Sequence, residues 1–328
     1  MEYNDEILEK PIIVIDEKPE VIPGQGEGET PVIVIERVTS QPSLDVVTVK
    51  PRRHWPWMLA AVLAAILLGL AAIGGYWYYR HNIYTGISVS VTSEQNIAWL
   101  SRKAPHGVKP EVVMTSDSIL GVGLNLYEMR GLVGEISYEE PTDSDASVFL
   151  YSRCSDITSY IPEECKPLGS LVMNGKVIHE ENNRLGYCAM ANGNTVIGVA
   201  RDEDVMEYCA EHGGNFFRQF VLVSDWQLPA NFHLHGKVER RAIGRLALSD
   251  ADPGTLYYIE SHGKEGMYEF ADALRAYGFR DAIYITGGTD YCFYRDAEGV
   301  PHDIGDTNRK GVPHKGQGLV PWLVFKRP

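Results

Sequence analysis

The residues with the clearest chemical potential follow a short apolar run late in the chain. Residues 282–285 (Ala-Ile-Tyr-Ile) are typical of a buried strand and lead directly into Thr-Gly-Gly-Thr-Asp. Glycines permit positive φ and close backbone approach to a ligand, and successive N–H groups can bind an anion. Taken alone, the pattern favours a plain tight turn, although a ligand-binding turn has the same composition. The candidate substrate-binding residues are Thr286, Gly287, Gly288 and Thr289, and the candidate catalytic carboxylate is Asp290.

A basic residue suited to phosphate stands earlier, in the run Arg240-Arg241-Ala242-Ile243-Gly244. A guanidinium can donate hydrogen bonds to two phosphate oxygens at once, so Arg240 is a candidate catalytic residue. The alternative is that Arg240 is simply a charged surface residue on a strand. Arg241 is expected to point to the other side of the strand. Between this run and the glycine turn, the spacing predicts a helix over 266–277 that ends at Gly278.

These motifs, in this order, resemble the phosphodiester glycosidase family, whose best-known member removes N-acetylglucosamine and so uncovers mannose-6-phosphate. The family pattern is Arg-Thr/Ser-Ala-Ile/Val-Gly, a helix ending in Leu-Gly, and then Ala-Ile-x-Leu-Asp-Gly-Gly. Residues 167–177, Pro-Leu-Gly-Ser-Leu-Val-Met-Asn-Gly-Lys-Val, are similar to an earlier hairpin of the family. The resemblance covers about residues 110–328 and is densest over 240–300. It implies the family's fold and an activity on a sugar-1-phosphodiester or a related envelope glycoconjugate.

The sequence departs from the family pattern at two places. Ile285-Thr286 stands where the family has Leu-Asp, so the acidic residue is absent there. The family's early Asn-Gly/Ala-Gly-Phe/Met turn is also missing near residues 152–156. Hydrolysis needs a group that neutralises phosphate and a carboxylate for acid–base work. Asp290 and Asp156 are the candidate replacements for the missing carboxylate, and no cofactor is implied.

Residues 82–328 are predicted to form one α+β domain that is rich in antiparallel strands and has a few helices. Residues 87–91 alternate as a strand, and Thr92 and Gln95 offer a capping box for a short helix to about 102. Asn174-Gly175 between 171–173 and 177–178 predicts a hairpin. Further strands are expected at 195–200, 219–223 and 320–325, and a helix at 202–211.

Histidines and cysteines give no strong signal of a metal site. His233 and His235 are two residues apart, but no further ligands recur at a spacing typical of zinc. Two isolated histidines on a strand are usually structural or solvated. Buried thiols or up to two disulfides with one thiol left over are both compatible with the pattern. The five cysteines are Cys154, Cys165, Cys188, Cys209 and Cys292.

Residues 55–79 carry no charge and predict a transmembrane helix. The stretch is apolar over about the 20 residues that a bilayer requires and has tryptophan and tyrosine at both ends. Lys50, Arg52 and Arg53 precede it, whereas Arg80 alone follows closely. The positive-inside rule therefore places the N-terminus in the cytoplasm and the domain on the outer side, which suits the periplasm of a bacterial inner membrane.

The division of the chain follows from this span. Residues 1–54 are predicted to be a disordered cytoplasmic tail, 80–110 a membrane-proximal connector, and 111–328 the glycosidase-like domain. Within the tail, Pro-Ile-Ile-Val-Ile-Asp at 11–16 recurs as Pro-Val-Ile-Val-Ile-Glu at 31–36. Such runs could add to the sheet edge of a cytoplasmic protein partner, or they are simply sticky segments flanked by charge.

Two functions from different classes remain open at this point. The net charge of −14 offers no electrostatic case for binding nucleic acid. The first function is a membrane-anchored glycosidase of sugar-1-phosphodiesters. The second is a catalytically inactive protein of the same fold that binds glycan or supports the envelope, which the missing acidic residue at position 286 favours. A carboxylate close to Thr286 and Arg240 would favour the first.

Overall fold

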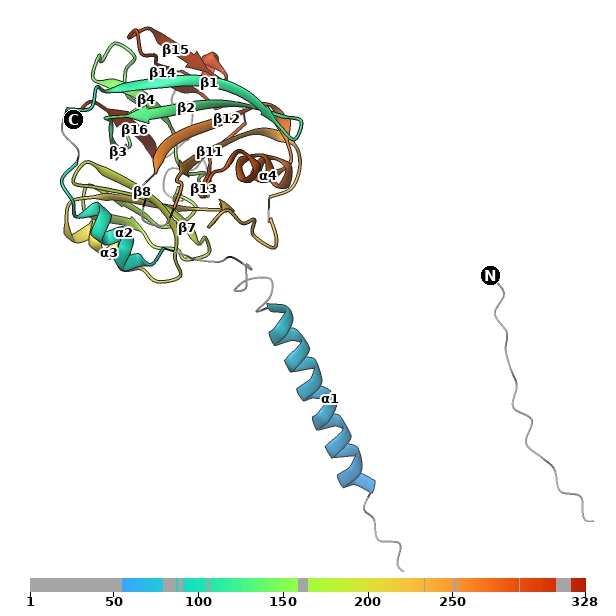
Figure 1. Cartoon of the computed structure of the whole chain (residues 1–328). Helices are drawn as coiled ribbons and strands as arrows, with labels where there is room; N and C mark the ends of the chain where they lie inside the picture. The colour runs from blue at the N-terminus through green and yellow to red at the C-terminus, as the bar shows by residue number, and fades with distance from the viewer. Residues whose placement is uncertain are drawn as a thin grey trace, which may run out of the picture. The chain divides into compact units, whose positions relative to one another are not determined.

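The computed structural model describes residues 55–78, 87, 91–104, 107–158, 165–232, 234–249, 252, 254–288, 290–310 and 320–328 (Figure 1). The predicted tail, with the repeats at 11–16 and 31–36, lies outside these residues. So do Thr289 and His233.

Helix α1, Trp55–Tyr78, is long and apolar enough to span a membrane. Residues Trp57–Tyr78 have a mean hydropathy of 2.4, and none of that stretch is buried by the rest of the protein. At 1.5 Å per residue the 22 residues extend about 33 Å, close to the thickness of a bilayer's hydrocarbon core. A core helix of a soluble protein would be buried instead. Among the described residues it is the single helix of this kind, which fits a single-pass membrane protein.

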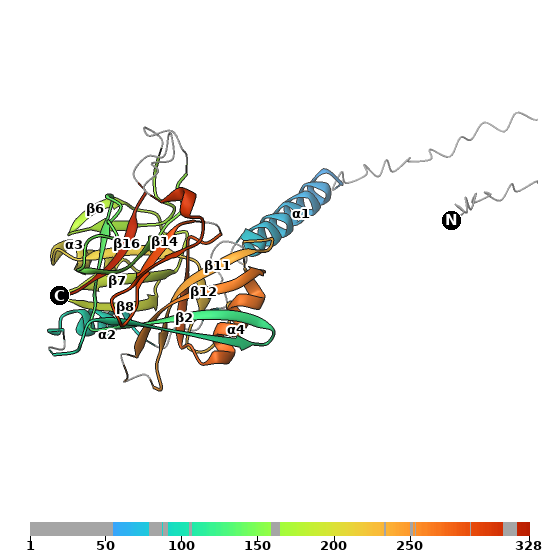
Figure 2. The ribbon, with the colours of Figure 1, turned by 90° about the horizontal axis from the view of Figure 1, so that it is seen from above.

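The domain is built from three sheets in which all strand pairs are antiparallel (Figures 1 and 2). The first sheet has the order β1 (Glu111–Ile119), β2 (Val122–Arg130), β12 (Thr255–Glu265), β11 (Val238–Leu246), β13 (Asp281–Ile285) and β10 (Val221–Val223). The second has the order β15 (Pro301–Ile304), β14 (Cys292–Arg295), β4 (Val148–Arg153), β16 (Trp322–Lys326) and β3 (Val133–Ser137). The third has the order β6 (Lys176–His179), β5 (Leu171–Met173), β9 (Asn215–Gln219), β7 (Gly186–Ala191) and β8 (Asn194–Val199).

Local sequence signals account for several of these elements. The β5–β6 hairpin turns at Asn174 and Gly175, whose φ angles of 48° and 78° match the predicted two-residue turn. Helix α2, Ser93–Leu100, begins with the expected capping box, and the Thr92 side chain accepts a hydrogen bond from the Gln95 N–H. Helix α4, Met267–Tyr277, ends at Gly278 in a left-handed conformation with φ 114°. Helix α3 occupies Asp204–Glu211, and a 3₁₀ turn occupies Thr307–Arg309.

Three apolar cores hold these layers together. The central core lies between the inner faces of the three sheets and contains side chains such as Ile243, Ile285 and Leu323. A second core lies between the first sheet and α4 (Figure 2), and a third lies between the third sheet and the pair α2–α3 (Figure 1). The mixed α and β architecture with mostly antiparallel sheets confirms the predicted fold class.

Two predicted strands differ from the structure. Ile87 and Val91 lie outside any strand, and residues 88–90 are outside the described part of the chain. The strand predicted at 219–223 is two strands, because β9 ends at Gln219 in the third sheet and β10 begins at Val221 in the first. Phe220 is the crossover between the two sheets, and its carbonyl accepts a hydrogen bond from the Tyr284 N–H at 2.8 Å.

Candidate functional site

Two acidic residues that are distant in sequence meet beyond the ends of β13, β4 and β14. Asp156 follows β4, and Asp290 precedes β14, which pairs with β4 through Ser152 and Cys292. Thr286 follows β13 directly. The side chains of Asp156, Asp290 and Thr286, together with Arg153 and Arg184, form what we call the carboxylate cluster. The other four members all lie close enough to Asp156 to influence its charge.

Asp156 has the most perturbed environment of the cluster. Burial raises the pKa of its carboxyl group, and the neighbouring charge of Asp290 raises this pKa further. Arg184, the Thr286 hydroxyl and Arg153 act in the opposite direction but do not cancel the rise. The Asp156 carbonyl is fixed by the Leu168 N–H at 2.8 Å and by the Ser155 hydroxyl at 2.9 Å. A partly buried carboxyl of this kind is suited to hold a proton and donate it.

Asp290 is buried and has a different electrostatic partner. Its Oδ1 lies 3.6 Å from Arg153 Nη1, and its carbonyl accepts a hydrogen bond from Arg241 Nη1 at 2.6 Å. Arg241 lies on the face of β11 opposite to Arg240, as the strand alternation predicts, and is paired with Glu260 at 3.1 Å. The backbone of Asp290 is therefore anchored from the central core.

Thr286 stands at the position where the phosphodiester glycosidase family, which the sequence resembles, has a carboxylate. Its Oγ1 is buried and has no well-aligned hydrogen-bond partner among the described residues. The hydroxyl nevertheless lies near enough to Asp156 to lower the pKa of that carboxyl. A threonine at 286 thus adjusts the proton affinity of Asp156 without adding a charge of its own.

The glycine turn is shaped by close packing. The Gly288 N–H donates to the Glu239 carbonyl at 2.7 Å, and the Gly287 N–H donates to the Tyr284 hydroxyl at 3.2 Å. A Cβ at Gly287 would lie 2.7 Å from the Glu239 carbonyl oxygen, and Gly288 has a φ of 70°. Both amides are therefore used within the chain. The close approach to β11 accounts for Gly287, and the left-handed backbone conformation accounts for Gly288.

Arg240 is buried, which excludes the alternative of a surface charge. Its Nε donates to the Glu265 carbonyl at 3.0 Å and its Nη2 to the Gly236 carbonyl at 2.6 Å. Its guanidinium carbon lies 6.0 Å from the centre of the Tyr284 ring. Arg240 thereby holds the segment before β11 against the end of β12 and borders the cluster through Tyr284. Its charge lowers the pKa of the Tyr284 hydroxyl, which burial raises overall.

Arg184 and Arg153 are members of the cluster that sequence reasoning missed. Arg184 precedes β7, is 7% exposed and lies with its guanidinium carbon 4.6 Å from the centre of the Phe220 ring. Its Nε and Nη1 are buried and have no hydrogen-bond partner among the described residues. Burial lowers the pKa of Arg184, whereas the charge of Asp156 opposes that change. No motif marks either arginine; Arg153 is three residues before Asp156 in the chain, whereas Arg184 is brought to it by the fold.

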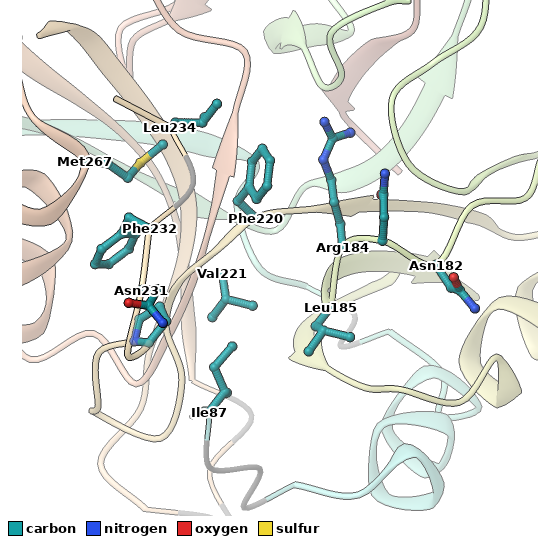
Figure 3. Close-up of a pocket in the computed structure, with 12 residues that line it drawn as sticks. Ile87, Asn182, Arg184, Leu185, Phe220, Val221, Asn231, Phe232, Leu234 and Met267 are labelled. Atoms are coloured by element: carbon teal, nitrogen blue, oxygen red, sulfur yellow. The ribbon is translucent and has the colours of Figure 1, made fainter. Parts of the chain in front are cut away.

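A cleft opens beside Arg184 (Figure 3). Phe220, Val221 and Leu185 lie along it, Phe232, Leu234 and Met267 form another side, and asparagines lie at its edge. Its lining residues are Ile87, Asn182, Asn183, Arg184, Leu185, Phe220, Val221, Pro229, Asn231, Phe232, Leu234 and Met267. The cleft therefore joins an unsatisfied cation to an apolar wall.

Metal and disulfide chemistry have no counterpart among the described residues. No group of three or more histidine, cysteine, aspartate or glutamate side chains there is arranged to hold a metal ion. The five cysteines, all within the described ranges, form no disulfide with one another. Burial raises the pKa of the thiols of Cys154, Cys188, Cys209 and Cys292, so they are poor nucleophiles.

Comparison with known proteins shows a distant similarity of fold. No family model matches the sequence, and no curated protein matches it. The structure is similar to the catalytic domain of zebrafish N-acetylglucosamine-1-phosphodiester alpha-N-acetylglucosaminidase, which was solved in a form auto-inhibited by its pro-peptide. The TM-score is 0.48 and the sequence identity is 10%. The similarity covers 69% of this chain and 86% of that one. A hypothetical protein from Synechocystis gives 0.44, with 12% identity over 68% of this chain and 64% of the other. A protein of Burkholderia pseudomallei K96243 described as exported gives 0.41, with 10% identity over 62% and 74%.

Proposed function

We propose that the domain hydrolyses a sugar-1-phosphodiester at the carboxylate cluster. The observation that carries the proposal is the placement of Asp156, whose pKa is raised, within the electrostatic influence of both Asp290 and the buried cation Arg184. Two carboxyl groups with different environments can take different roles in glycoside cleavage. The motif resemblance at Arg240 and residues 282–288 points to the same reaction class.

Each residue has a role that its surroundings support. Protonated Asp156 donates its proton to the oxygen between the sugar C1 and phosphorus, and the C1–O bond breaks. A phosphate monoester leaves with that proton and the bonding electrons. Asp290, beside Arg153, accepts a proton from the water that adds to C1. Arg184 binds the phosphate oxygens through its Nε and Nη1, and Arg240 positions Tyr284 and the glycine turn.

The test is hydrolysis of N-acetylglucosamine-1-phosphodiesters and other sugar-1-phosphodiesters by the full chain in detergent. Asp156→Asn and Asp290→Asn are expected to lower kcat/KM by about 10²- to 10⁴-fold. Asp272→Asn, on the exposed side of α4, is the matched control and should retain activity. Arg240→Ala is expected to reduce turnover by releasing the turn. Absence of turnover across several sugars by a folded protein would overturn the proposal in favour of a non-catalytic glycan-binding protein, for which the threonine at 286 is the argument.

We further propose that the N-terminus is cytoplasmic and that the domain faces the outer side of the membrane. The basic residues before α1 support this orientation. Alkaline phosphatase fused after Pro328 should be active in a bacterial host, because that enzyme requires an oxidising compartment. An inactive phosphatase together with a fluorescent cytoplasmic reporter at the same position would reverse the orientation.

A further inference from the structure

The cleft beside Arg184 combines one buried cation with a mostly apolar wall. Of its twelve lining residues, eight are apolar. Figure 3 shows the Arg184 guanidinium next to Phe220, with Val221 and Leu185 following along the cleft and Phe232 opposite them. The apolar wall therefore continues away from the arginine. A polar sugar would leave much of this wall uncompensated, whereas a hydrocarbon chain would cover it.

Arg184 is suited to a ligand of negative charge. Burying an arginine without hydrogen bonds to its Nε and Nη1 costs free energy, and an anion that accepts from both would recover it. Asp156 is close, but its raised pKa means that it is protonated over a wider pH range than an exposed aspartate. Phosphate oxygens would fill this role.

The room available suits a phosphate with a chain attached. The cleft has a volume of about 60 Å³, enough for a small group such as phosphate and the first carbons beside it. An adjoining hollow of about 370 Å³ shares Asn231, Phe232, Leu234 and Met267 with the cleft. A chain leaving the cleft thus passes Phe232, Leu234 and Met267, which line both spaces.

The covalent chain keeps this cleft near the end of α1. Ile87 lines the cleft and is nine residues beyond Tyr78, the last residue of α1. Nine residues reach at most about 30 Å when fully extended. If α1 spans a membrane, the cleft therefore remains within reach of a lipid whose phosphate stands at the bilayer surface.

From these observations we propose that the cleft binds the phosphate and the adjoining hydrocarbon chain of a membrane-embedded lipid phosphate. Resting on the proposed function, this assigns the substrate class as a lipid-linked sugar phosphodiester. Arg184 binds the phosphate, and Leu185, Val221 and Phe232 contact the chain. The sugar then lies toward Asp156 and Asp290.

Photolabelling of the full chain tests the assignment. The probe is geranylgeranyl phosphate with a terminal diazirine, mixed into phosphatidylcholine vesicles that contain the protein, and labelled residues are mapped by mass spectrometry. We expect label on residues of the cleft and of the adjoining hollow. Unlabelled geranylgeranyl phosphate should compete at least about tenfold better than either geranylgeraniol or inorganic phosphate, because a charge-assisted hydrogen bond contributes about a factor of ten or more.

Matched variants separate the cation from the apolar wall. Arg184→Gln and Leu185→Gln should each reduce cleft labelling about tenfold, whereas the exposed controls Arg275→Gln and Leu248→Gln should leave it unchanged. Circular dichroism of each variant establishes that it is folded. Label confined to α1, or cleft label insensitive to Arg184→Gln, would overturn the proposal. Equal competition by inorganic phosphate would also overturn it, since that result assigns a phosphate site without a lipid chain.

The photolabelling result does not depend on whether the protein hydrolyses a sugar phosphodiester. Cleft labelling without hydrolysis of any sugar phosphodiester would retain the lipid phosphate site and remove the glycosidase. Hydrolysis of a water-soluble phosphodiester without cleft labelling would do the reverse.

Discussion

Arg153 Nη1 lies 3.6 Å from Asp290 Oδ1, whereas the largest attractive charge on Asp156 is that of Arg184. The two carboxylates of the cluster thus have different cationic partners although they influence one another. Such a division is what separates an acid from a base in a pair of carboxyl groups. It follows from the pairing of β4 with β14, which brings Arg153 and Asp290 together, and from the position of Arg184 before β7.

Replacing Asp156 with asparagine should stabilise the folded domain at pH 7. The pKa of Asp156 is higher in the folded than in the unfolded chain, so ionisation of this group opposes folding as the pH rises through that range. The asparagine side chain cannot ionise and avoids this cost. Each 1 kcal/mol gained should raise Tm by about 2–4 °C. Wild type and Asp156→Asn should converge below about pH 4, where the aspartate is protonated in both states.

Asp303 is the control residue, because its pKa is lowered in the folded chain whereas that of Asp156 is raised. The Tyr291 hydroxyl donates to its Oδ1 at 2.6 Å and lowers the pKa of this carboxyl. Its stabilising effect is present above the unfolded pKa and is lost as the pH falls, so Asp303→Asn should lower Tm at pH 7. Thermal unfolding of both variants across pH checks the pair, and a lower Tm for Asp156→Asn at pH 7 would contradict the environment assigned to Asp156.

Replacing Thr286 with valine should raise the pKa of Asp156. Valine keeps the shape but removes the hydroxyl that lowers this pKa, whereas Thr286→Ser retains it. Carbon-13 NMR titration of the aspartate carboxyls should show the shift in Thr286→Val alone. If Asp156 is the proton donor, the alkaline limb of the pH profile of kcat/KM should move to higher pH in the same variant. Identical titrations in the valine and serine variants would show that the hydroxyl has no influence.

The sequence predicts more of the fold than of the carboxylate cluster. Asn174-Gly175 and Gly278 are local signals with fixed conformational meaning, so the hairpin and the end of α4 follow from them. Arg153 and Arg184 belong to no motif. Arg153 is only three residues from Asp156 in the chain, but the pairing of β4 with β14 is what brings Asp290 to it, and Arg184 reaches Asp156 through the packing of the sheets.

The glycine turn is a local pattern that leaves two interpretations open. Gly287-Gly288 has the composition of an anion-binding loop, but the composition does not indicate whether the amides are already bonded. The Tyr284 hydroxyl, three residues earlier, and the Glu239 carbonyl on the distant strand β11 accept from them, and the second acceptor is set by the pairing of β11 with β13.

Replacing Arg241 with glutamine should destabilise the domain strongly. Arg241 is fully buried, pairs with Glu260 and donates to the Asp290 carbonyl. Removing it leaves a largely buried carboxylate without its cation, which costs about 3–5 kcal/mol. Urea unfolding measures the loss. Adding Glu260→Gln should recover part of it, whereas Arg275→Gln on α4, an exposed pair with Asp272, should cost at most about 1 kcal/mol. Equal losses for Arg241→Gln and Arg275→Gln would refute the assignment.

Replacing Gly305 with alanine should displace Asp290. Gly305 has a φ of 78°, and an added Cβ would overlap the Asp290 carbonyl oxygen and lie 2.8 Å from Arg241 Nη2. Gly299 is the matched control, because its φ is 85° and an added Cβ would meet nothing within 4 Å. Both alanines bear the left-handed backbone strain of about 1–2 kcal/mol. The Gly305 variant alone should lose more stability than this and, in the proposed reaction, most of its kcat. Equal unfolding free energies and equal turnover for the two variants would mean that the position of Asp290 does not depend on the space that Gly305 leaves.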